Sequence, residues 1–457
     1  MIAQQAARNI VRKLREQGHQ AYFVGGCVRD LLLAREPADY DVATSATPGQ
    51  VMEIFPRTYA VGAQFGVVLV PASSLALASS AAPPSSPPSS AREEIIEVAT
   101  FRSDGEYRDG RRPHQVSFTA SPEEDVQRRD FTINGLLFDP EKDEVLDFVG
   151  GRFDLHAGIL RTIGDPRARF TEDKLRMLRA IRFAARLGYQ VERETMLAIR
   201  DYAASIGDVS PERVREELLK MLTEGHAGAA FAMLDIPGLL FHVLPEVAAM
   251  KGVQQPPQFH PEGDVWVHTL MMLGMLPPGV SPALAMGVLL HDVGKPPTFR
   301  VAPDRIRFDG HVGVGVKMAE AICRRLRFSN QDTAQILALV ANHMRFADVK
   351  KMKDSTFKRF LRLPGFDEHL ELHRIDCLSS HGKLELYDFT RERRQLLPPE
   401  SIHPRPLLSG NDLMAAGYPP GPQFKEILAA LEDAQLEGKI NSRSEALQYL
   451  ATAFPKP

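Results

Sequence analysis

The alternation of apolar and polar residues predicts a short α/β region at the start of the chain and a long helical region after it. Residues 2–18 have the apolar spacing of an amphipathic helix. Ala21–Val24 is an apolar run typical of a short buried strand, and a helix is predicted over Val28–Leu33. From about Gly151 onward the periodicity is helical, and Thr171–Asp173 is expected to cap a long helix. Further strands are predicted at Val67–Val70, Ile95–Phe101 and Val116–Phe118. The predicted fold class is therefore α+β, a small mixed sheet followed mostly by helices.

Changes in composition divide the chain further. A stretch of Ala, Ser and Pro at about residues 73–92 cannot bury enough apolar surface to fold, so we expect a disordered surface loop there. Prolines at Pro398-Pro399 indicate a linker before a last helical segment. The predicted segments are a head at 1–150, a helical neck at 151–250, a histidine-rich domain at 251–395 and a C-terminal helical segment at 396–457.

The bulk composition is that of an ordinary soluble globular protein, with 44 % hydrophobic and 25 % charged residues. No apolar run approaches the ~20 residues that cross a bilayer, and the first residues lack the pattern of a signal peptide, so no membrane contact is expected. Three cysteines far apart in sequence favour reduced thiols in a cytoplasmic protein. Because the net charge is −3, any RNA contact must come from local basic surfaces. The oligomeric state is not indicated.

The first candidate for chemistry follows the first predicted strand. Two glycines, Gly25 and Gly26, allow a phosphate to approach the backbone, and the next helix directs its N-terminal amides and Arg29 toward that anion. Asp39 and Asp41 alternate along the chain, so on a strand their side chains share one face. Two such carboxylates suit a pair of Mg²⁺ ions that activate an attacking hydroxyl and stabilise a leaving pyrophosphate. Glu97, on a later predicted strand, is either a third carboxylate or a solvent-facing residue.

Four ordered segments resemble the class II nucleotidyltransferases, which comprise CCA-adding enzymes and bacterial poly(A) polymerases. The first is GGCVRDLLLAREPADYDVAT at residues 25–44. The others are Phe101–Tyr107 with Asp109–Pro113, then Arg128–Asn134, and last Gly164–Pro166 leading into Glu172–Phe183. The resemblance covers residues 20 to about 190. It implies a transferase that uses Mg²⁺ in the head and extends the 3′ end of a tRNA.

The same resemblance assigns roles to residues of the neck. Asp173 and Arg176 are three apart on a predicted helix and face the same way, so together they offer an acceptor and a donor for the edge of a base. By resemblance this pair selects CTP and ATP; an intrahelical ion pair is the structural alternative. The resemblance also gives residues that hold the triphosphate and ribose, which are Gly26, Arg29, Arg129, Arg179 and Arg182.

Two activities within this family stay open. CCA addition to tRNA is favoured over poly(A) polymerase or an A-adding tRNA enzyme, because Val61–Gly66 lacks the Arg-rich segment of the bacterial poly(A) polymerases. The complete loop at Asp109–Pro113 argues against an enzyme that adds only C.

A second candidate site lies in the histidine-rich segment. Its order of residues resembles the HD phosphohydrolase superfamily, which implies metal ligands at His268, His291, Asp292 and Asp376. His311 and His343 match positions that bind a second metal or a phosphate in some members. Imidazole with carboxylate suits a divalent ion such as Mg²⁺, Mn²⁺, Fe or Ni²⁺, which can activate water for phosphoester hydrolysis. Two alternatives remain: a domain that serves only as an RNA platform, and a chain that is mainly a phosphohydrolase whose head grips RNA ends.

Overall fold

The computed structural model describes residues 2–60, 65–75, 94–104, 116–258 and 260–455. These residues form two compact units, Met1–Met221 with Ala229–Val243 and Leu222–Gly228 with Leu244–Pro457. This division into two units is coarser than the four segments expected from the sequence, at 1–150, 151–250, 251–395 and 396–457. The boundaries of those four segments stay a prediction. Most of the expected loop at 73–92, and the part of the flexible-loop motif at 105–113, lie outside the described residues.

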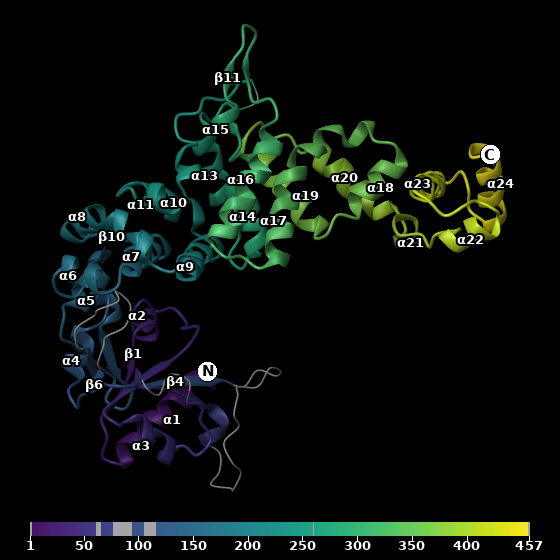
Figure 1. Cartoon of the computed structure of the whole chain (residues 1–457). Coiled ribbons are helices and arrows are strands. Elements are labelled where there is room, and N and C mark those ends of the chain that lie inside the picture. The colour runs from purple at the N-terminus through teal and green to yellow at the C-terminus, as the bar shows by residue number, and fades with distance from the viewer. Residues whose placement is uncertain (1, 61–64, 76–93, 105–115, 259, 456–457) are drawn as a thin grey trace. The chain divides into compact units, whose positions relative to one another are not determined.

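The first unit is built on a six-stranded mixed sheet (Figure 1). Its strands, in spatial order, are β3 (Val67–Pro71), β4 (Ile95–Thr100), β2 (Asp41–Thr44), β1 (Ala21–Val24), β7 (Leu136–Asp139) and β8 (Glu144–Asp147). Only β2 and β4 run parallel in this sheet; the other neighbours are antiparallel. Val42 and Val98 are paired across the parallel strands and fully buried, so the intervening residues on each strand are directed to the opposite face.

Helices α1 (Ile2–Glu16) and α3 (Pro48–Ile54) pack against this sheet (Figure 1). The buried stripe Ile10, Val11 and Leu14 explains why α1 docks there, and Thr47 begins α3 with a capping box. Shorter elements complete the region: α2 (Gly26–Leu32), α4 (Pro122–Gln127), α5 (Gly151–Ala157), and a separate hairpin of β5 (Arg102–Asp104) and β6 (Val116–Phe118).

The rest of the first unit is mostly helical, apart from a short parallel pair of strands, β9 (Ile159–Leu160) and β10 (Gln190–Val191). Its main helices are α6 (Pro166–Glu172), α7 (Leu175–Leu187), α8 (Arg193–Tyr202), α9 (Pro211–Thr223), α10 (Ala227–Asp235) and α11 (Leu239–Val243). One expectation needs correction. Thr171 and Glu172 do not begin the long helix, because they form the end of α6. Asp173 lies between the two helices, where its carboxylate accepts a hydrogen bond from the backbone N–H of Leu175. Asp173 and Arg176 are therefore not on one continuous helix.

The second unit is a helical assembly around α14 (Pro282–Leu290), whose residues from Ala283 onward are all buried. Against it pack α13 (Val265–Gly274), α17 (Asn330–Asn342) and α19 (Phe366–Ser379). The helix α16 (His311–Arg325) and the 3₁₀ segment η5 (His343–Lys351) pack against α17. Gly294 precedes α15 (Lys295–Thr298), and a Cβ there would lie 2.1 Å from the carbonyl oxygen of His311. Only glycine therefore allows α15 to approach the start of α16 so closely.

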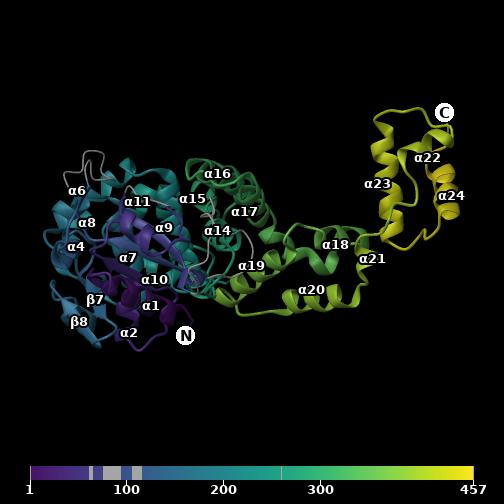
Figure 2. The same ribbon diagram turned by 90° about the horizontal axis from the view of Figure 1, so that it is seen from below.

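The C-terminal helices α22 (Gly410–Ala415), α23 (Gln423–Leu436) and α24 (Arg443–Ala453) pack around an apolar cluster of their own (Figure 2). Arg359 and Arg362 on α18 (Asp354–Leu361) and just after it form ion pairs with Glu432 on α23. The α+β fold class predicted from the sequence is confirmed. Among the described residues, no helix combines the length and hydropathy needed to span a membrane.

Candidate functional site

The carboxylates of the head meet at the start of β2. Asp41 is the Cα partner of Glu97 on the parallel strand β4, so both side chains leave the same face of the sheet. Asp39 precedes β2 and is exposed. Gly25 follows β1 with a φ of 77°, and a Cβ there would lie 3.9 Å from Asp41 Oδ2 and 4.0 Å from Arg129 Nη1. The glycine turn, the carboxylate and the arginine therefore surround one small volume, as the sequence predicted.

Electrostatics distinguish Asp41 from an ordinary surface carboxylate. Burial and the negative charges of Glu97 and Asp39 raise the pKa of Asp41 to about 7, while Arg129 opposes the shift. Loss of hydration also raises the pKa of Glu97; Arg129 lowers it and Asp39 raises it. Crowded carboxylates with raised pKa values favour a bound cation, and their oxygens are the ligands that Mg²⁺ prefers. These three residues therefore fit the predicted Mg²⁺ site.

Arg29 lies beside the glycine turn and has protein partners that the sequence did not indicate. Its side chain is buried, and its guanidinium donates to Asp30 Oδ1 at 2.9 Å and to Asn134 Oδ1 at 2.9 Å. Asn134 donates in turn to Asp130, whose other carboxylate oxygen accepts two hydrogen bonds from Arg179. A hydrogen-bond network thus connects the glycine turn with α7. Arg29 braces this network, and a direct contact with phosphate stays a prediction.

Two arginines of α7 and Arg29 of α2 gather on one aromatic ring of α7. The guanidinium carbons of Arg29, Arg179 and Arg182 lie 5.7, 5.4 and 4.3 Å from the centre of the Phe183 ring. Arg182 donates to the buried Glu217 on α9 at 2.7 Å. Each arginine is thus held by an acid and a ring, which fixes its position before any triphosphate arrives.

The two residues predicted to read the base contact different partners. Asp173 accepts hydrogen bonds from both Nη atoms of Arg213 on α9, at 3.1 and 2.7 Å. Arg176 donates to Glu172 at 2.5 Å and to the backbone carbonyl of Arg128 at 3.1 Å. The intrahelical Asp173–Arg176 ion pair, the structural alternative, is therefore not what holds these side chains. Their role in base selection stays a prediction.

Histidines and aspartates from several helices meet in the second unit. His268 lies on α13, His291 follows α14, and His311 and His343 begin α16 and η5. Among the described residues, two groups of the predicted ligands offer ligand atoms within 4.8 Å of one another, one made of His268, His291 and Asp292, the other of Asp292, His311 and His343. Asp292 belongs to both of these. A third such group adjoins them and is made of His260, Glu262 and His268. Asp376 on α19 lies beside the first group, because its Oδ1 is 3.2 Å from His268 Nε2. All the ligands predicted from the sequence are therefore brought together.

The hydrogen bonds of these histidines point to a metal. The Nδ1 atoms of His291, His311 and His343 each hydrogen-bond a backbone carbonyl, at 2.8, 3.0 and 2.7 Å. Their Nε2 atoms, and that of His268, are buried and have no hydrogen-bond partner among the described residues. A neutral imidazole that donates from Nδ1 presents a bare Nε2 lone pair, which is the form that binds metal. The donor set fits a divalent ion held by imidazole and carboxylate.

The charges of this cluster are strongly coupled. Burial acts to lower the pKa of His268, but the adjacent carboxylates of Asp376 and Glu262 raise it to about 9. Burial lowers the pKa of His343 to about 4. Burial acts to raise the pKa of Asp292, yet the charges of His291 and Lys295 hold it well below its usual range. A cation among these ligands would take the place of the proton on His268.

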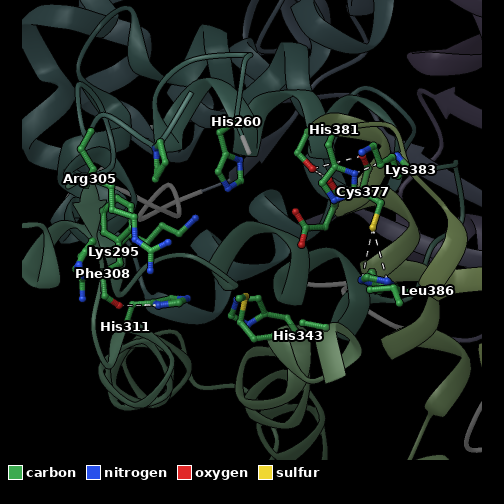
Figure 3. Close-up of a pocket in the computed structure, with 18 of the residues that line it drawn as sticks. His260, Lys295, Arg305, Phe308, His311, His343, Cys377, His381, Lys383 and Leu386 are labelled. Carbon is green, nitrogen blue, oxygen red and sulfur yellow. Dashed lines mark hydrogen bonds between the residues drawn. The ribbon is translucent and has the colours of Figure 1, made fainter. Parts of the chain in front are cut away.

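A cavity of about 610 Å³ opens beside these ligands (Figure 3). His260, His311 and His343 are directed into it, and Asp376 lines its wall. Cationic residues also line it, and Phe308, Met344 and Leu386 give it an apolar side. The cationic residues are Lys295, Arg305, Arg307 and Lys383. Such a lining suits an anionic group near the metal ligands and a less polar group farther out.

Comparisons with known proteins agree with this architecture. Residues 21–161 match the poly A polymerase head domain, and residues 188–251 match the "probable RNA and SrmB-binding site of polymerase A". Residues 311–451 match tRNA nucleotidyltransferase domain 2. The CCA-adding enzyme of Bacillus cereus is 29 % identical over 97 % of this chain and 96 % of its own length. The crystal structure of the Bacillus stearothermophilus CCA-adding enzyme in complex with CTP covers 98 % of this chain and 97 % of its own, with 26 % identity and a TM-score of 0.73.

Three parts of the chain thus match models of poly(A) polymerase and tRNA nucleotidyltransferase domains, and its whole length is similar to a CCA-adding enzyme. The resemblance predicted from the head motifs is thereby confirmed. Similarity is uneven along the chain: the CCA-adding enzyme of Geobacillus sp. (strain WCH70) is 42 % identical, but over only 52 % of this chain and 54 % of its own length. The alignment thus spans about half the length of that curated relative. The matches in the second unit are to nucleotidyltransferase domains, so its resemblance to HD phosphohydrolases stays a prediction.

Several residues that build the candidate nucleotidyltransferase site were not singled out from the sequence. Asp125 holds both Arg128 and Arg129, and its side chain is almost fully buried. Glu217 and Arg213, both on α9, hold Arg182 and Asp173. A buried acid close to paired arginines in the sequence was a usable signal for Asp125. No local signal identifies the α9 residues, because their partners lie 35 and 40 positions away.

Proposed function

We propose that this chain is a CCA tRNA nucleotidyltransferase that adds C, C and A to the 3′ end of tRNA from CTP and ATP without a nucleic acid template. The single observation that carries the proposal is the pairing of Asp41 with Glu97 beside the Gly25 turn and Arg129. A metal pair on Asp39, Asp41 and Glu97 would lower the charge of the triphosphate and activate the 3′ hydroxyl. The full-length similarity to enzymes named for CCA addition supports the choice of substrates.

The side chains of this unit divide the work. Arg129 is close enough to Asp41 to influence its pKa, so it is placed to contact the phosphates at the carboxylates. Arg179 and Arg182 are fixed by Asp130 and Glu217, and we assign them the ribose and the triphosphate. Asp173 and Arg176 would exchange Arg213 and Glu172 for the edge of the base. The exchange costs little when charged hydrogen bonds replace charged hydrogen bonds.

The test is a transfer assay with purified protein, Mg²⁺ and tRNA transcripts that end before CCA, after one C and after both C residues. Each nucleotide is supplied alone. CTP should extend the first two transcripts and ATP only the third, while UTP and GTP are rejected. Extension of every transcript by ATP alone, beyond one residue, would make the chain a poly(A) polymerase or an A-adding enzyme instead.

A second activity is favoured by the unpaired Nε2 atoms of His268, His291, His311 and His343. We infer that the second unit binds a divalent metal at these histidines with Asp292 and Asp376, as in an HD phosphohydrolase. Such a metal would supply an activated water for phosphoester hydrolysis. Lys295, whose Nζ lies 2.6 Å from Asp292 Oδ2, is placed to bind a phosphoryl oxygen at the cavity. Metal content after purification, and phosphate release from p-nitrophenyl phosphate with Mn²⁺ or Ni²⁺, test this activity.

The site of action that we propose is the cytoplasm. The three cysteines are free and buried, which agrees with a reducing compartment. Fractionation of cells that express the tagged chain would check the assignment.

A further inference from the structure

One carboxylate in the second unit is not a predicted metal ligand but contacts two histidines. Glu262 lies in the loop before α13, and its side chain is only 5 % exposed. Its Oε1 lies 2.7 Å from Nδ1 of His268 and 2.8 Å from Nδ1 of His260. An ionised carboxylate accepts hydrogen bonds and does not donate them. The Nδ1 atom of His268 and the Nδ1 atom of His260 therefore each carry a proton that is directed at Glu262.

This contact decides which nitrogen of His268 is available to a metal. With the Nδ1 proton directed at Glu262, the Nε2 atom faces Asp376 and has no hydrogen-bond partner among the described residues. The other three histidines of the cluster are oriented in the same sense, but by neutral backbone carbonyls of Val288, Phe308 and Val340. His268 alone is oriented by a charged group. An anionic acceptor increases the basicity of the opposite nitrogen more than a carbonyl does.

We propose that Glu262 is the positioning residue that sets the divalent-metal affinity of the second site, through the tautomer and orientation of His268. His260 shares the same carboxylate oxygen, and its ring packs edge-on to the His268 ring at a centroid distance of 5.0 Å. His260 is thus a second donor to Glu262, and the bond between Glu262 and His268 does not depend on it. The inference rests on the metal site proposed above.

The first experiment measures Mn²⁺ binding to the full-length chain by isothermal titration calorimetry. Glu262→Gln keeps the size of the side chain and removes its charge, and the Mn²⁺ affinity should fall by about 10–100-fold. Glu385→Gln is the matched control, because Glu385 lines the same cavity but is exposed. It removes the same charge and should bind Mn²⁺ as the wild type does.

A second readout separates positioning from a general structural role. In protein labelled with ¹⁵N-histidine, His268 should give the shifts of an Nδ1-protonated ring that binds metal at Nε2. In Glu262→Gln this signature should shift toward a mixture of tautomers. His260→Ala removes the other donor to Glu262 but leaves the bond to His268, so its Mn²⁺ affinity should stay close to that of the wild type.

The outcomes distinguish the two proposals. Equal Mn²⁺ affinity of the wild type and Glu262→Gln would overturn the role of Glu262 and leave the metal site standing. An affinity loss in His260→Ala as large as in Glu262→Gln would also overturn it, because the loop rather than the carboxylate would then set the affinity. If the wild type binds no divalent metal, the metal site itself is wrong, and the inference fails with it.

Discussion

In the first unit, Asp41 and Glu97 are held by the register of two parallel strands, whereas in the second unit the ligands come from the ends and faces of separate helices. The strands fix backbone separation but leave Glu97 and Asp39 exposed to solvent. The helices bury His268 and His291 and fix each ring through its Nδ1 atom. We therefore expect the head to bind its Mg²⁺ together with an incoming triphosphate, and the second unit to retain its metal between reactions.

The largest effect is expected from removal of the head carboxylate. Asp41→Ala removes the proposed Mg²⁺ ligand that lies on β2 beside the Gly25 turn. The rate of nucleotide addition should fall by at least about 10²–10³-fold, because stabilisation of charge in the transition state is lost. Phosphate release by the second unit should be unchanged. Transfer of labelled CMP to tRNA measures the first activity; addition at the full rate would refute the assignment of Asp41.

The reciprocal change is Asp376→Ala. It removes a predicted ligand from the second unit, so the metal content after purification, measured by inductively coupled plasma mass spectrometry, should drop well below one ion per chain. CCA addition should continue at the wild-type rate with Mg²⁺, because no step of transfer uses this residue. Loss of transfer in this variant would show that the two sites are not independent.

A smaller and more specific effect is expected at the base-reading pair. Asp173→Ala removes the acceptor now held by Arg213, and discrimination of CTP and ATP against UTP and GTP should fall by about 10–100-fold, the value of one or two charged hydrogen bonds. The kcat/KM ratios for the four nucleotides measure it. An unchanged nucleotide preference would remove Asp173 from base selection. Arg213→Ala should preserve more discrimination than Asp173→Ala, because it leaves the acceptor in place.

The smallest effect concerns the free energy of unfolding, to which the hydrogen-bond network of Asn134, Asp130 and Arg179 contributes. Burial acts to raise the pKa of Asp130, but Arg179 lowers it overall. A lowered folded-state pKa contributes stability at pH values above the unfolded pKa of about 3.9, and this contribution is lost as pH falls through the folded pKa. Asp130→Asn should therefore lower the free energy of unfolding by about 3 kcal/mol at pH 7. Urea unfolding at pH 7 and pH 3 checks it: the difference from the wild type should shrink at pH 3, and an undiminished difference would contradict the account.

Local sequence predicted the elements whose signal is local. The strands at Ala21–Val24 and Val67–Pro71 and the helix at Ile2–Glu16 were found within a few residues of their expected bounds. Strands β7 and β8 were not predicted, because β7 is a short run whose place beside β1 depends on pairing across more than 110 residues. The break between α6 and α7 was also missed, since a capping pattern at residues 171–173 resembles the start of a helix whether or not another helix precedes it.

Among the site residues too, those with a local sequence signal could be selected, and those whose contacts join distant segments could not. Spacing and resemblance were enough to select Asp41, Glu97 and the histidine ligands, which the fold brings together. The acids that hold the arginines, such as Glu217, could not be selected, because their contacts exist only after α9 packs against α7. For the same reason the contact of Arg29 with Asn134 could not be foreseen, while its predicted contact with phosphate stays a prediction.

The activity of the head is decided by the nucleotides added to a tRNA transcript that ends before CCA, with all four nucleotides and Mg²⁺ present. We expect one C, a second C and one A, after which addition stops. A run of A residues, a product that contains U or G, or no product at all would contradict this expectation.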